Sequence, residues 1–391
     1  MPFDEQNSGK LGLGIIGLGL AGSMMVPAAQ RHARIELRGA AEPNLALRAR
    51  FEECMKARAH ESALDLIRRE DIDAVYIATP HQLHREQAIL AAEHGKHVIV
   101  EKPMALTLQD CDAMIETAAK HNIKLIVGHT HSFDPPMRLM HRYSVEKTLG
   151  DLAMLSMWNF TDFMYRPRRP EELDTKLGGG ILFNQIPHQV DIARLVAASP
   201  VRSVRSWTGV LDPSRPTEGA STTFMEFRNG AVATMVYSGY DHFDSDELHG
   251  WVSSTGRRKE PTHGTMRRRL LELTDADDER RRRSELYGYH GLHPAQPEYQ
   301  PHFGIIVASY LQGDLRATPE GIAEYGHNGK RDIKLESTYA GRDCVLDELC
   351  AAVLDLKPPA HDGEFARDTL EACLAIQKSA YEGREVVIAS P

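Results

Sequence analysis

The sequence lacks the features that mark nucleic-acid-binding and membrane-spanning proteins. Its 391 residues carry 46 Lys and Arg against 55 Asp and Glu, a net charge of −9. It therefore has no cation excess to replace the counterions of a nucleic acid. No apolar run approaches the ~18 residues that a membrane span requires. We expect neither a nucleic-acid partner nor a membrane segment.

Cysteine is scarce, and its five positions form no CxxC pair. An odd number of scattered cysteines is typical of free thiols in a reducing compartment, not of a disulfide framework or a zinc site. The first ten residues, MPFDEQNSGK, contain two acids and no apolar segment. We therefore expect no signal peptide and a cytoplasmic protein.

What is present is an ordinary globular composition, 42% hydrophobic and 26% charged. Its first third alternates apolar runs with helical patterns, which predicts a parallel, doubly wound sheet with ligands at the carboxyl ends of its strands. We expect strands at 11–16, 35–41, 73–79, 97–100 and 123–128, and helices at 23–32, 84–94 and 108–121.

A glycine-rich turn directly follows the first expected strand. GLGLAG places Gly17, Leu18, Gly19 and Gly22 in a G-x-G-x-x-G pattern, in which the glycines permit a tight turn, close approach of a pyrophosphate and close helix packing. Glu42 ends the second strand twenty residues later. A carboxylate there accepts ribose hydroxyls and repels a 2′-phosphate, which favours NAD over NADP. The alternative is that Glu42 only caps a turn.

Polar residues follow the later strands: Thr79-Pro80, Glu101-Lys102-Pro103 and, after the last strand, His131. Lys102 can hold a substrate hydroxyl or carbonyl, although surface lysines are common. Glu101 can orient Lys102 or contact the nicotinamide ribose. His131 is a candidate for binding substrate. No acid or cysteine stands at ligand spacing from the histidines of this region, so we expect no metal site.

The pattern changes near residue 134, where two prolines suggest a hinge and a boundary between domains 1–134 and 135–391. Strand-like runs then follow one another at 152–160, 203–210, 222–227 and 231–238, and the last two are joined by a short hairpin turn. They predict an antiparallel sheet with one face against a helix layer or another subunit, so we expect a homo-oligomer, either a dimer or a tetramer. We expect residues 255–300 to form an insertion or mobile loop.

The segment GGGILFNQIPHQVD at 178–191 predicts a helix that begins near Ile186 and carries Asn184, His188 and Asp191 close to one face. A neutral histidine can take a hydroxyl proton while hydride leaves the same carbon. A buried histidine with only local bonds is the alternative for His188. Asp191 either orients His188 or supports packing.

Three arginines, Arg166, Arg168 and Arg169, lie on the proline-stiffened stretch YRPRRP just before these glycines. Guanidinium groups bind carboxylates with two parallel hydrogen bonds, so a dicarboxylate substrate would explain them. An ordinary solvated loop would explain them equally well.

Several of these segments together resemble the glucose–fructose oxidoreductase/inositol dehydrogenase (Gfo/Idh/MocA) family. They are GLGLAG, ATPHQLHREQAILAAEHGKHVIVEKPMAL at 78–106 with Thr79-Pro80, His84 and Glu101-Lys102-Pro103, the GGGILFNQIPHQVD segment, and LAIQKSAYEGREVVI at 374–388. The resemblance implies a Rossmann domain followed by an α+β domain with a large, mostly antiparallel sheet and a C-terminal helix. It also implies NAD(P)-linked hydride transfer at a hydroxyl-bearing carbon.

In that family the residue matching Lys102 positions the substrate, and the one matching His188 is a common acid or base. The family's aspartate is Asn184 here, and its glycine is Ile186. Asn184 can hold a substrate group but cannot act as a base. Without that carboxylate Lys102 is more easily neutral, so the base is either His188 or Lys102.

YRPRRPEELDTKLGGG at 165–180 and YQPHFGIIVASYLQGDLRATPEGIAEYG at 299–326 also resemble a branch of the family that includes phthalate cis-dihydrodiol dehydrogenases. The resulting prediction is an NAD-dependent dehydrogenase of a cyclic diol, such as a phthalate cis-4,5-dihydrodiol that becomes a catechol. The alternatives are a sugar or inositol dehydrogenase and a non-catalytic NAD(P)-binding regulator.

Overall fold

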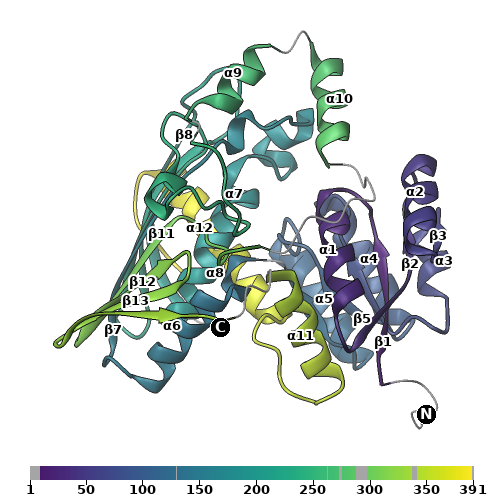
Figure 1. The fold of residues 1–391 in the computed structure, drawn as a ribbon, viewed down its shortest axis with the longest axis horizontal. Helices are drawn as coiled ribbons and strands as arrows, with labels where there is room; N and C mark the ends of the chain where they lie inside the picture. The colour runs from purple at the N-terminus through teal and green to yellow at the C-terminus, as the bar shows by residue number, and fades with distance from the viewer. Residues whose placement is uncertain are drawn as a thin grey trace. The chain divides into compact units, whose positions relative to one another are not determined.

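The structure, a computed structural model, describes residues 9–128, 130–261, 263–272, 275–287, 297–336 and 341–389. Tertiary contacts divide the chain into two units (Figure 1). The first comprises residues 1–129, 284–295 and 342–367, and the second comprises residues 130–283, 296–341 and 368–391.

The units are not continuous in sequence, whereas we expected one boundary at residue 134. The segment 342–367 is assigned to the first unit because its side chains bond there. Asp343 accepts a hydrogen bond from Arg31 Nε at 2.7 Å, and Arg367 Nε donates to Asp112 at 2.6 Å. The ranges 1–134 and 135–391 stay a prediction of where independently folding domains lie.

The first unit contains the predicted parallel sheet, with six strands in the order β3-β2-β1-β4-β5-β6. The strands are β1 (Leu11–Ile16), β2 (Ile35–Ala41), β3 (Arg58–His60), β4 (Ala74–Ile77), β5 (His97–Val100) and β6 (Leu125–Val127). Every residue of β1, β4 and β6 is buried, as expected for strands covered on both faces. The predicted Rossmann-type α/β fold is confirmed.

Helices flank this sheet: α1 (Leu20–Arg31), α2 (Leu45–Met55), α3 (Ala63–Ile67), α4 (His84–Glu93), α5 (Leu108–Lys120), α11 (Gly341–Val353) and the start of α12 (Gly363–Glu382). The side chains of Asn44 and Thr107 cap α2 and α5 by accepting backbone N–H groups. Helix α1 begins three residues earlier than predicted because Gly19 is its N-cap. The short elements α2, β3 and α3 were not predicted.

The second unit contains a nine-stranded sheet in the order β14-β13-β12-β11-β7-β10-β9-β8-β15. Its strands are β7 (Leu152–Phe160), β8 (Val201–Gly209), β9 (Ala220–Phe227), β10 (Val232–Ser238), β11 (Ile305–Tyr310), β12 (Gly313–Thr318), β13 (Gly321–Gly326), β14 (Gly329–Lys334) and β15 (Val386–Val387). All neighbours are antiparallel except β7 and β10, which run parallel. The mostly antiparallel sheet and the β9–β10 hairpin were predicted correctly.

Helices cover one face of this sheet, namely α6 (Pro135–Glu146), α7 (Gly180–Asn184), α8 (Ile186–Ala197) and the later part of α12 (Figure 1). For example, Ser379 Oγ of α12 accepts the Ser206 N–H of β8 at 2.9 Å. The opposite face keeps Trp158 of β7, Trp207 of β8 and Phe224 of β9 between 41% and 52% exposed.

The segment 255–300, expected to be an insertion or mobile loop, contains two helices, α9 (Thr265–Leu271) and α10 (Ala276–Tyr287). Residues 262, 273–274 and 288–296 of that segment lie outside the described residues. These helices contradict a loop at their positions, whereas an insertion stays a prediction. Helix α10 was not predicted because it has no apolar stripe. Acids fill its first turn, and Arg281 and Arg282 pair with Asp278 at 2.5 and 3.4 Å.

Within the described ranges, no helix combines the length and apolarity that crossing a bilayer demands.

Candidate active site in two parts

The turn after β1 has the shape that a dinucleotide requires. Gly17 has φ +93°, a left-handed value that glycine adopts without strain. A Cβ on Gly22 would lie 1.9 Å from the Gly17 carbonyl oxygen, so the close approach of α1 requires glycine there. A Cβ on Gly19 would meet nothing within 4 Å, so there is open space beside the first turn of α1. Leu18 is fully buried and anchors the turn.

The Glu42 carboxylate, 9% exposed, stands beside this turn at the end of β2. Its oxygens accept the Leu18 N–H at 2.8 Å and the Asn44 N–H at 3.0 Å. Each carboxylate oxygen has two acceptor sites, so both can also accept a ribose hydroxyl. In dinucleotide-binding folds, an acidic residue at the end of the second strand hydrogen-bonds to the ribose hydroxyl. The open space at Gly19 and the acceptor at Glu42 therefore fit NAD.

His84, the first residue of α4, links two loops at the carboxyl ends of the strands. Its Nδ1 lies 3.0 Å from the Pro103 carbonyl oxygen and its Nε2 lies 3.0 Å from that of Thr79. Burial lowers the pKa of His84, while these carbonyl contacts oppose the change. Thr79 also donates its hydroxyl to Gln87 at 2.7 Å. These bonds hold the Thr79-Pro80 turn close to the Glu101-Lys102-Pro103 turn.

Glu101 is buried, 8% exposed, and bonded within the first unit. Its carboxylate accepts the Tyr76 hydroxyl, the Arg342 guanidinium at 3.4 Å and the Lys102 N–H at 3.2 Å. Burial and the adjacent carboxylate raise the pKa of Tyr76 well above its ordinary value. Glu101 thus fixes the backbone of Lys102, whose side chain is half-buried. The role predicted for Lys102 stays a prediction.

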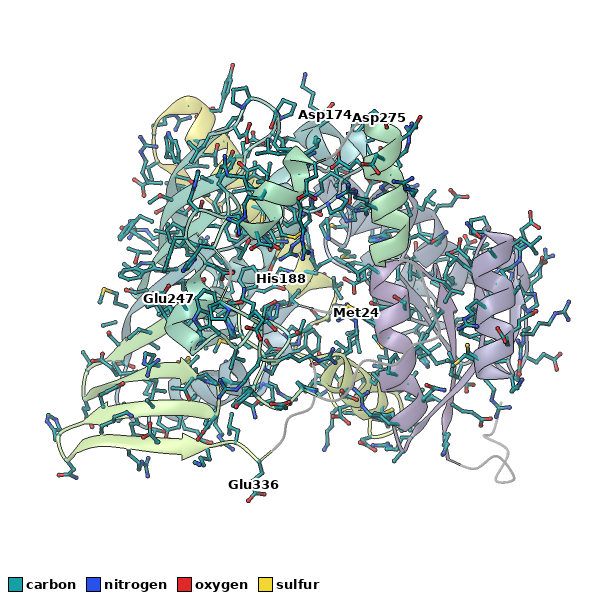
Figure 2. All side chains as sticks on the ribbon, turned by 45° about the horizontal axis from the view of Figure 1, so that its top comes forward. Met24, Asp174, His188, Glu247, Asp275 and Glu336 are labelled. Carbon is teal, nitrogen blue, oxygen red and sulfur yellow. The ribbon has the colours of Figure 1, made fainter. Side chains whose placement is uncertain are left out.

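His188 lies in the first turn of α8 and is 8% exposed (Figure 2). Asn184 belongs to the separate short helix α7, because the chain breaks at Gln185. The expected single helical face therefore does not extend to Asn184. Its amide nitrogen donates to the carbonyls of Gly178 and Gly180 at 3.1 and 2.8 Å, which closes the glycine loop. A contact of Asn184 with substrate stays a prediction.

Asp191, one turn further along α8, accepts the hydroxyl of Thr369 on α12. Arg194 donates to the same Thr369 oxygen at 2.7 Å and to Asp368 at 2.9 Å. These bonds join α8 to α12, which agrees with a role of Asp191 in packing. The other role, orienting His188, stays a prediction.

His131 lies close to His188 within the second unit, in the short 3₁₀ helix η2 (His131–Phe133). Their ring centroids are 5.1 Å apart, and both rings contact Phe303, at 4.9 and 4.8 Å. His131 Nδ1 lies 2.6 Å from Oδ2 of Asp134, whose side chain is 1% exposed. This cluster brings two imidazoles and one carboxylate together.

The three arginines of YRPRRP all pair with nearby acids. Arg166 binds Asp162 at 2.7 Å, Arg169 lies 3.2 Å from Glu171, and Arg168 lies 4.0 Å from Glu172. The Arg168 guanidinium stacks 3.7 Å above the ring of Phe163 and donates to its carbonyl oxygen at 2.5 Å. Burial raises the pKa of Asp162, but the charge and hydrogen bond of Arg166, together with the charge of Lys259, give a net downward shift. Carboxylate binding by these arginines stays a prediction.

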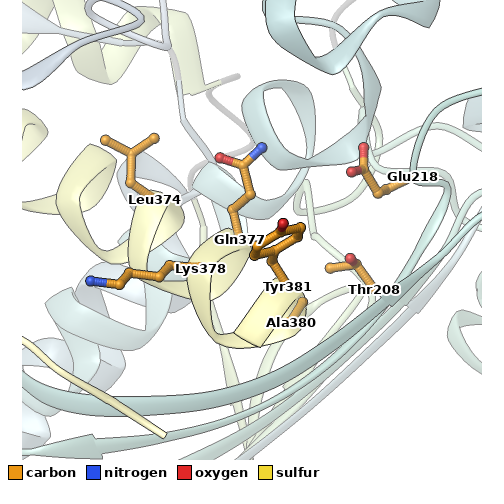
Figure 3. A pocket seen from close by; sticks show the side chains of 7 residues that line it. All are labelled: Thr208, Glu218, Leu374, Gln377, Lys378, Ala380 and Tyr381. Carbon is orange, nitrogen blue, oxygen red and sulfur yellow. The ribbon is translucent and has the colours of Figure 1, made fainter. Parts of the chain in front are cut away.

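A cavity of about 390 Å³ lies elsewhere in the second unit, between the start of β9, the end of β8 and the last turns of α12 (Figure 3). It is lined by Thr208, Glu218, Leu374, Gln377, Lys378, Ala380 and Tyr381. None of the predicted site residues lines it. Over the residues that the structure describes, no group of three His, Cys, Asp or Glu side chains is placed to hold a metal ion.

Sequence reasoning missed Asp134 and Phe303. The spacing His131-x-x-Asp134 at the start of α6 was a usable signal, since a residue at a helix N-cap can meet a side chain three residues away. Phe303 had none, because only the tertiary fold brings it to the histidines.

The first unit has the fold of a dinucleotide-binding protein, and comparison with known proteins shows which class of protein the chain belongs to. Residues 11–129 match the family described as "Oxidoreductase family, NAD-binding Rossmann fold", and residues 137–253 match the GFO/IDH/MocA C-terminal domain. The chain belongs to the Gfo/Idh/MocA family of oxidoreductases. It is a dehydrogenase with an NAD-binding domain, so the alternative of a non-catalytic regulator is not retained.

The chain is similar to the 1-carboxy-3-chloro-3,4-dihydroxycyclohexa-1,5-diene dehydrogenase of Comamonas testosteroni, with 39% identity over 375 residues and 93% of each chain. It is 25% identical to the myo-inositol 2-dehydrogenase of Thermotoga maritima over 83% of this chain and 93% of that one. Among solved structures, a protein from Bordetella bronchiseptica RB50 is 41% identical, with a TM-score of 0.93 over 97% of this chain and 100% of that one.

Proposed function

We propose that this dehydrogenase oxidises one hydroxyl of a carboxylated cyclic cis-diol with NAD, giving a hydroxyketone that becomes a catechol. The observation that carries the proposal is the similarity, over 93% of both chains, to a dehydrogenase of a carboxylated dihydroxycyclohexadiene. A phthalate cis-4,5-dihydrodiol is the first candidate substrate.

NAD, when bound, supplies the hydride acceptor. Gly17, Gly19 and Gly22 would cradle its pyrophosphate, and Glu42 would accept its ribose hydroxyls. Because Glu42 is an acid, a 2′-phosphate there would meet like charge, which supports NAD over NADP. Thr79, Pro80 and Glu101 would line the nicotinamide end.

Three residues would act on the diol. Lys102, whose backbone Glu101 fixes, would hold a hydroxyl by charge-assisted hydrogen bonding. His188, packed against Phe303, would accept the proton of the hydroxyl whose carbon is oxidised. Asn184 would support the site from the glycine loop. Arg166, 39% exposed, would exchange Asp162 for a substrate carboxylate, with Arg168 and Arg169 holding the loop.

The test is a substrate panel with purified protein and NAD, in which formation of reduced nicotinamide is followed and the product identified. Phthalate cis-4,5-dihydrodiol, the cis-dihydrodiol of benzoate, unsubstituted benzene cis-dihydrodiol and myo-inositol form the panel. The protein should turn over the two carboxylated diols fast and the other two compounds slowly. Turnover of myo-inositol alone would replace the proposal with the polyol alternative, which the Thermotoga relative favours.

The exposed sheet face supports a homo-oligomer. Trp158 lies opposite Val236, Trp207 opposite Thr222 and Phe224 opposite Thr234, so the three rings project from the same face. Rings this exposed on one sheet face are typical of a protein interface. We propose that a second copy of the chain covers this face.

A further inference from the structure

His131 is held by a buried carboxylate. Its Nδ1 lies 2.6 Å from Oδ2 of Asp134, whose side chain is 1% exposed, while that of His131 is 13% exposed. Asp134 is also the N-cap residue of α6, and its carbonyl oxygen accepts the N–H groups of Met137 and Arg138 at 2.9 and 3.1 Å. The helix start therefore fixes the backbone from which this carboxylate extends.

This bond determines which nitrogen of His131 carries its proton. A carboxylate only accepts hydrogen bonds, so Nδ1 must donate. In the neutral imidazole the lone pair is then on Nε2. A carboxylate that fixes a histidine in this way is how enzymes prepare an imidazole as a base.

A second acid–base group beside His188 matches a chemical need of the proposed reaction. Oxidation of one hydroxyl moves a hydride to NAD and a proton to His188, and leaves a hydroxyketone. Conversion of that ketone to a catechol then requires two more proton transfers. The hydrogen on the neighbouring carbinol carbon must leave as a proton, and the carbonyl oxygen must gain one.

We propose that His131, fixed by Asp134, is the base for this second step. His131 Nε2 takes the carbinol-carbon proton, and the C–H electron pair forms the ring double bond. The carbonyl π electrons move to oxygen, which receives the proton held by His188. His188 returns to its neutral form and His131 releases its proton to water. The protein would thus catalyse the tautomerisation as well as the oxidation, an inference that rests on the proposed function.

The fold supports two bases acting on one ring. Both imidazoles contact Phe303, at 4.9 and 4.8 Å, and their rings are tilted by 66° to each other. Phe303, itself 4% exposed, holds both at the same apolar surface. Proton transfer by a positioned side chain contributes about 10²- to 10⁴-fold.

Other titratable groups surround the pair. Asp191 lies on α8 with His188, and Tyr237 of β10 stacks on Phe303 at 6.2 Å. His302 precedes Phe303. The charges of His131 and Lys259 lower the pKa of His302, and that of Asp134 raises it. Burial lowers the pKa of His302 to about 4, so His302 stays neutral in an assay near neutral pH.

The test compares two time courses after rapid mixing of the protein with NAD and the dihydrodiol. In the unmodified protein, catechol should appear together with reduced nicotinamide. In His131→Asn and Asp134→Asn, reduced nicotinamide should form first and catechol should lag. Glu247→Gln is the matched control, because it breaks another His–carboxylate bond in the same unit, His263–Glu247 at 2.7 Å. Catechol that keeps pace with reduced nicotinamide in His131→Asn would overturn the inference.

A second measurement separates this inference from the proposed function. With ADP-ribose in place of NAD, the protein should exchange the carbinol-carbon hydrogen of 2-hydroxycyclohexanone with deuterium from solvent, about 10²-fold faster than His131→Asn does. Exchange without oxidation of the diol would remove the proposed substrate and keep the second base. If the diol is oxidised but the unmodified protein and His131→Asn exchange hydrogen at equal rates, the proposed substrate stays and the second base is removed.

Nitrogen-15 NMR of labelled histidine distinguishes a catalytic tautomer from mere packing. The His131 signal, assigned by its loss in His131→Asn, should show a proton on Nδ1, and Asp134→Asn should move the proton to Nε2. A proton on Nε2 in the unmodified protein would contradict the proposed role.

Discussion

At the scale of single residues, Glu42 gives the clearest prediction about the cofactor. Glu42→Gln keeps one acceptor oxygen for the Leu18 N–H but removes the charge. A hydrogen bond to a charged group contributes about 1.5–3 kcal/mol and a neutral one about 0.5–1.5 kcal/mol. The difference should raise the Kd for NADH about tenfold, and the Kd for NADPH should fall relative to it. Fluorescence titration of both cofactors measures this. An unchanged NADH/NADPH ratio would show that Glu42 only supports the turn.

The two candidate bases are separated by their variants. His188→Asn should lower kcat by about 10²- to 10⁴-fold with little change in NAD affinity, because proton acceptance is lost. Lys102→Met should mainly raise KM for the diol, because substrate positioning is lost. If His188→Asn instead kept most of kcat while Lys102→Met abolished it, Lys102 would be the base.

The sequence predicted these residues better than it predicted their contacts. Gly17, Gly22 and Glu42 follow a spacing fixed by local backbone geometry, so their placement could be read from the motif. The placement of Asn184 could not be predicted from the motif. The helix breaks at Gln185, and the Asn184 amide binds the carbonyl of Gly180 in the glycine loop. The pairing of Arg168 with the Phe163 ring was also invisible in a string of arginines.

At the scale of elements, helix α10 should depend on charge and not on apolar packing. Its Glu279 accepts Arg215 at 2.8 Å and the Arg168 N–H at 2.8 Å, and its Arg283 donates to Glu172 at 2.9 Å. Arg215 is only 3% exposed. Glu279→Gln leaves the Arg215 guanidinium without its counter-charge. This loss should destabilise the second unit by about 3 kcal/mol.

Thermal unfolding measures this loss. Asp277→Asn is the control, because it removes an α10 acid that is 81% exposed and should change little. Equal unfolding temperatures for the two variants would show that the Glu279 contacts do not hold the helix.

Elements were predictable where periodicity decides them. Strands β1 and β2 match their expected bounds because buried apolar runs and alternation specify them. Helix α10 was missed because charge pairs stabilise it, and strand β14 was missed because its polar residues are exposed and show no buried alternation. The parallel pairing of β7 with β10 is a property of topology, on which local sequence carries no information.

At the scale of the whole molecule, acid should destabilise the fold through buried histidines. Burial lowers the pKa of His249 to about 3, with help from His302, and lowers that of His302 to about 4. Both pKa values lie below the ordinary histidine value of about 6.5. Below pH ~6.5 these histidines are therefore protonated in the unfolded chain before they are protonated in the folded one. Stability is therefore full above pH ~6.5 and is lost as the pH falls.

Unfolding temperatures between pH 8 and pH 5 should be flat at first and then decline, and the decline should be shallower in His302→Gln. A constant unfolding temperature down to pH 5 would contradict this assignment.

The exposed face of the large sheet predicts association. Trp158→Arg with Trp207→Arg should shift the protein to a smaller species in sedimentation equilibrium, because charges would be buried at the interface. Lys334→Glu, on the edge strand β14, is a control that changes the net charge by the same amount in the opposite direction. A monomer before any substitution would refute the proposed interface.

The central claim is oxidation of a carboxylated cyclic cis-diol by NAD. Its most direct measurement is the amount of reduced nicotinamide and of catechol formed from phthalate cis-4,5-dihydrodiol by the purified protein. One molecule of each should form per diol consumed, and NADP should be a poorer hydride acceptor than NAD. Neither product from any carboxylated cyclic diol, with myo-inositol oxidised at a normal rate, would contradict it.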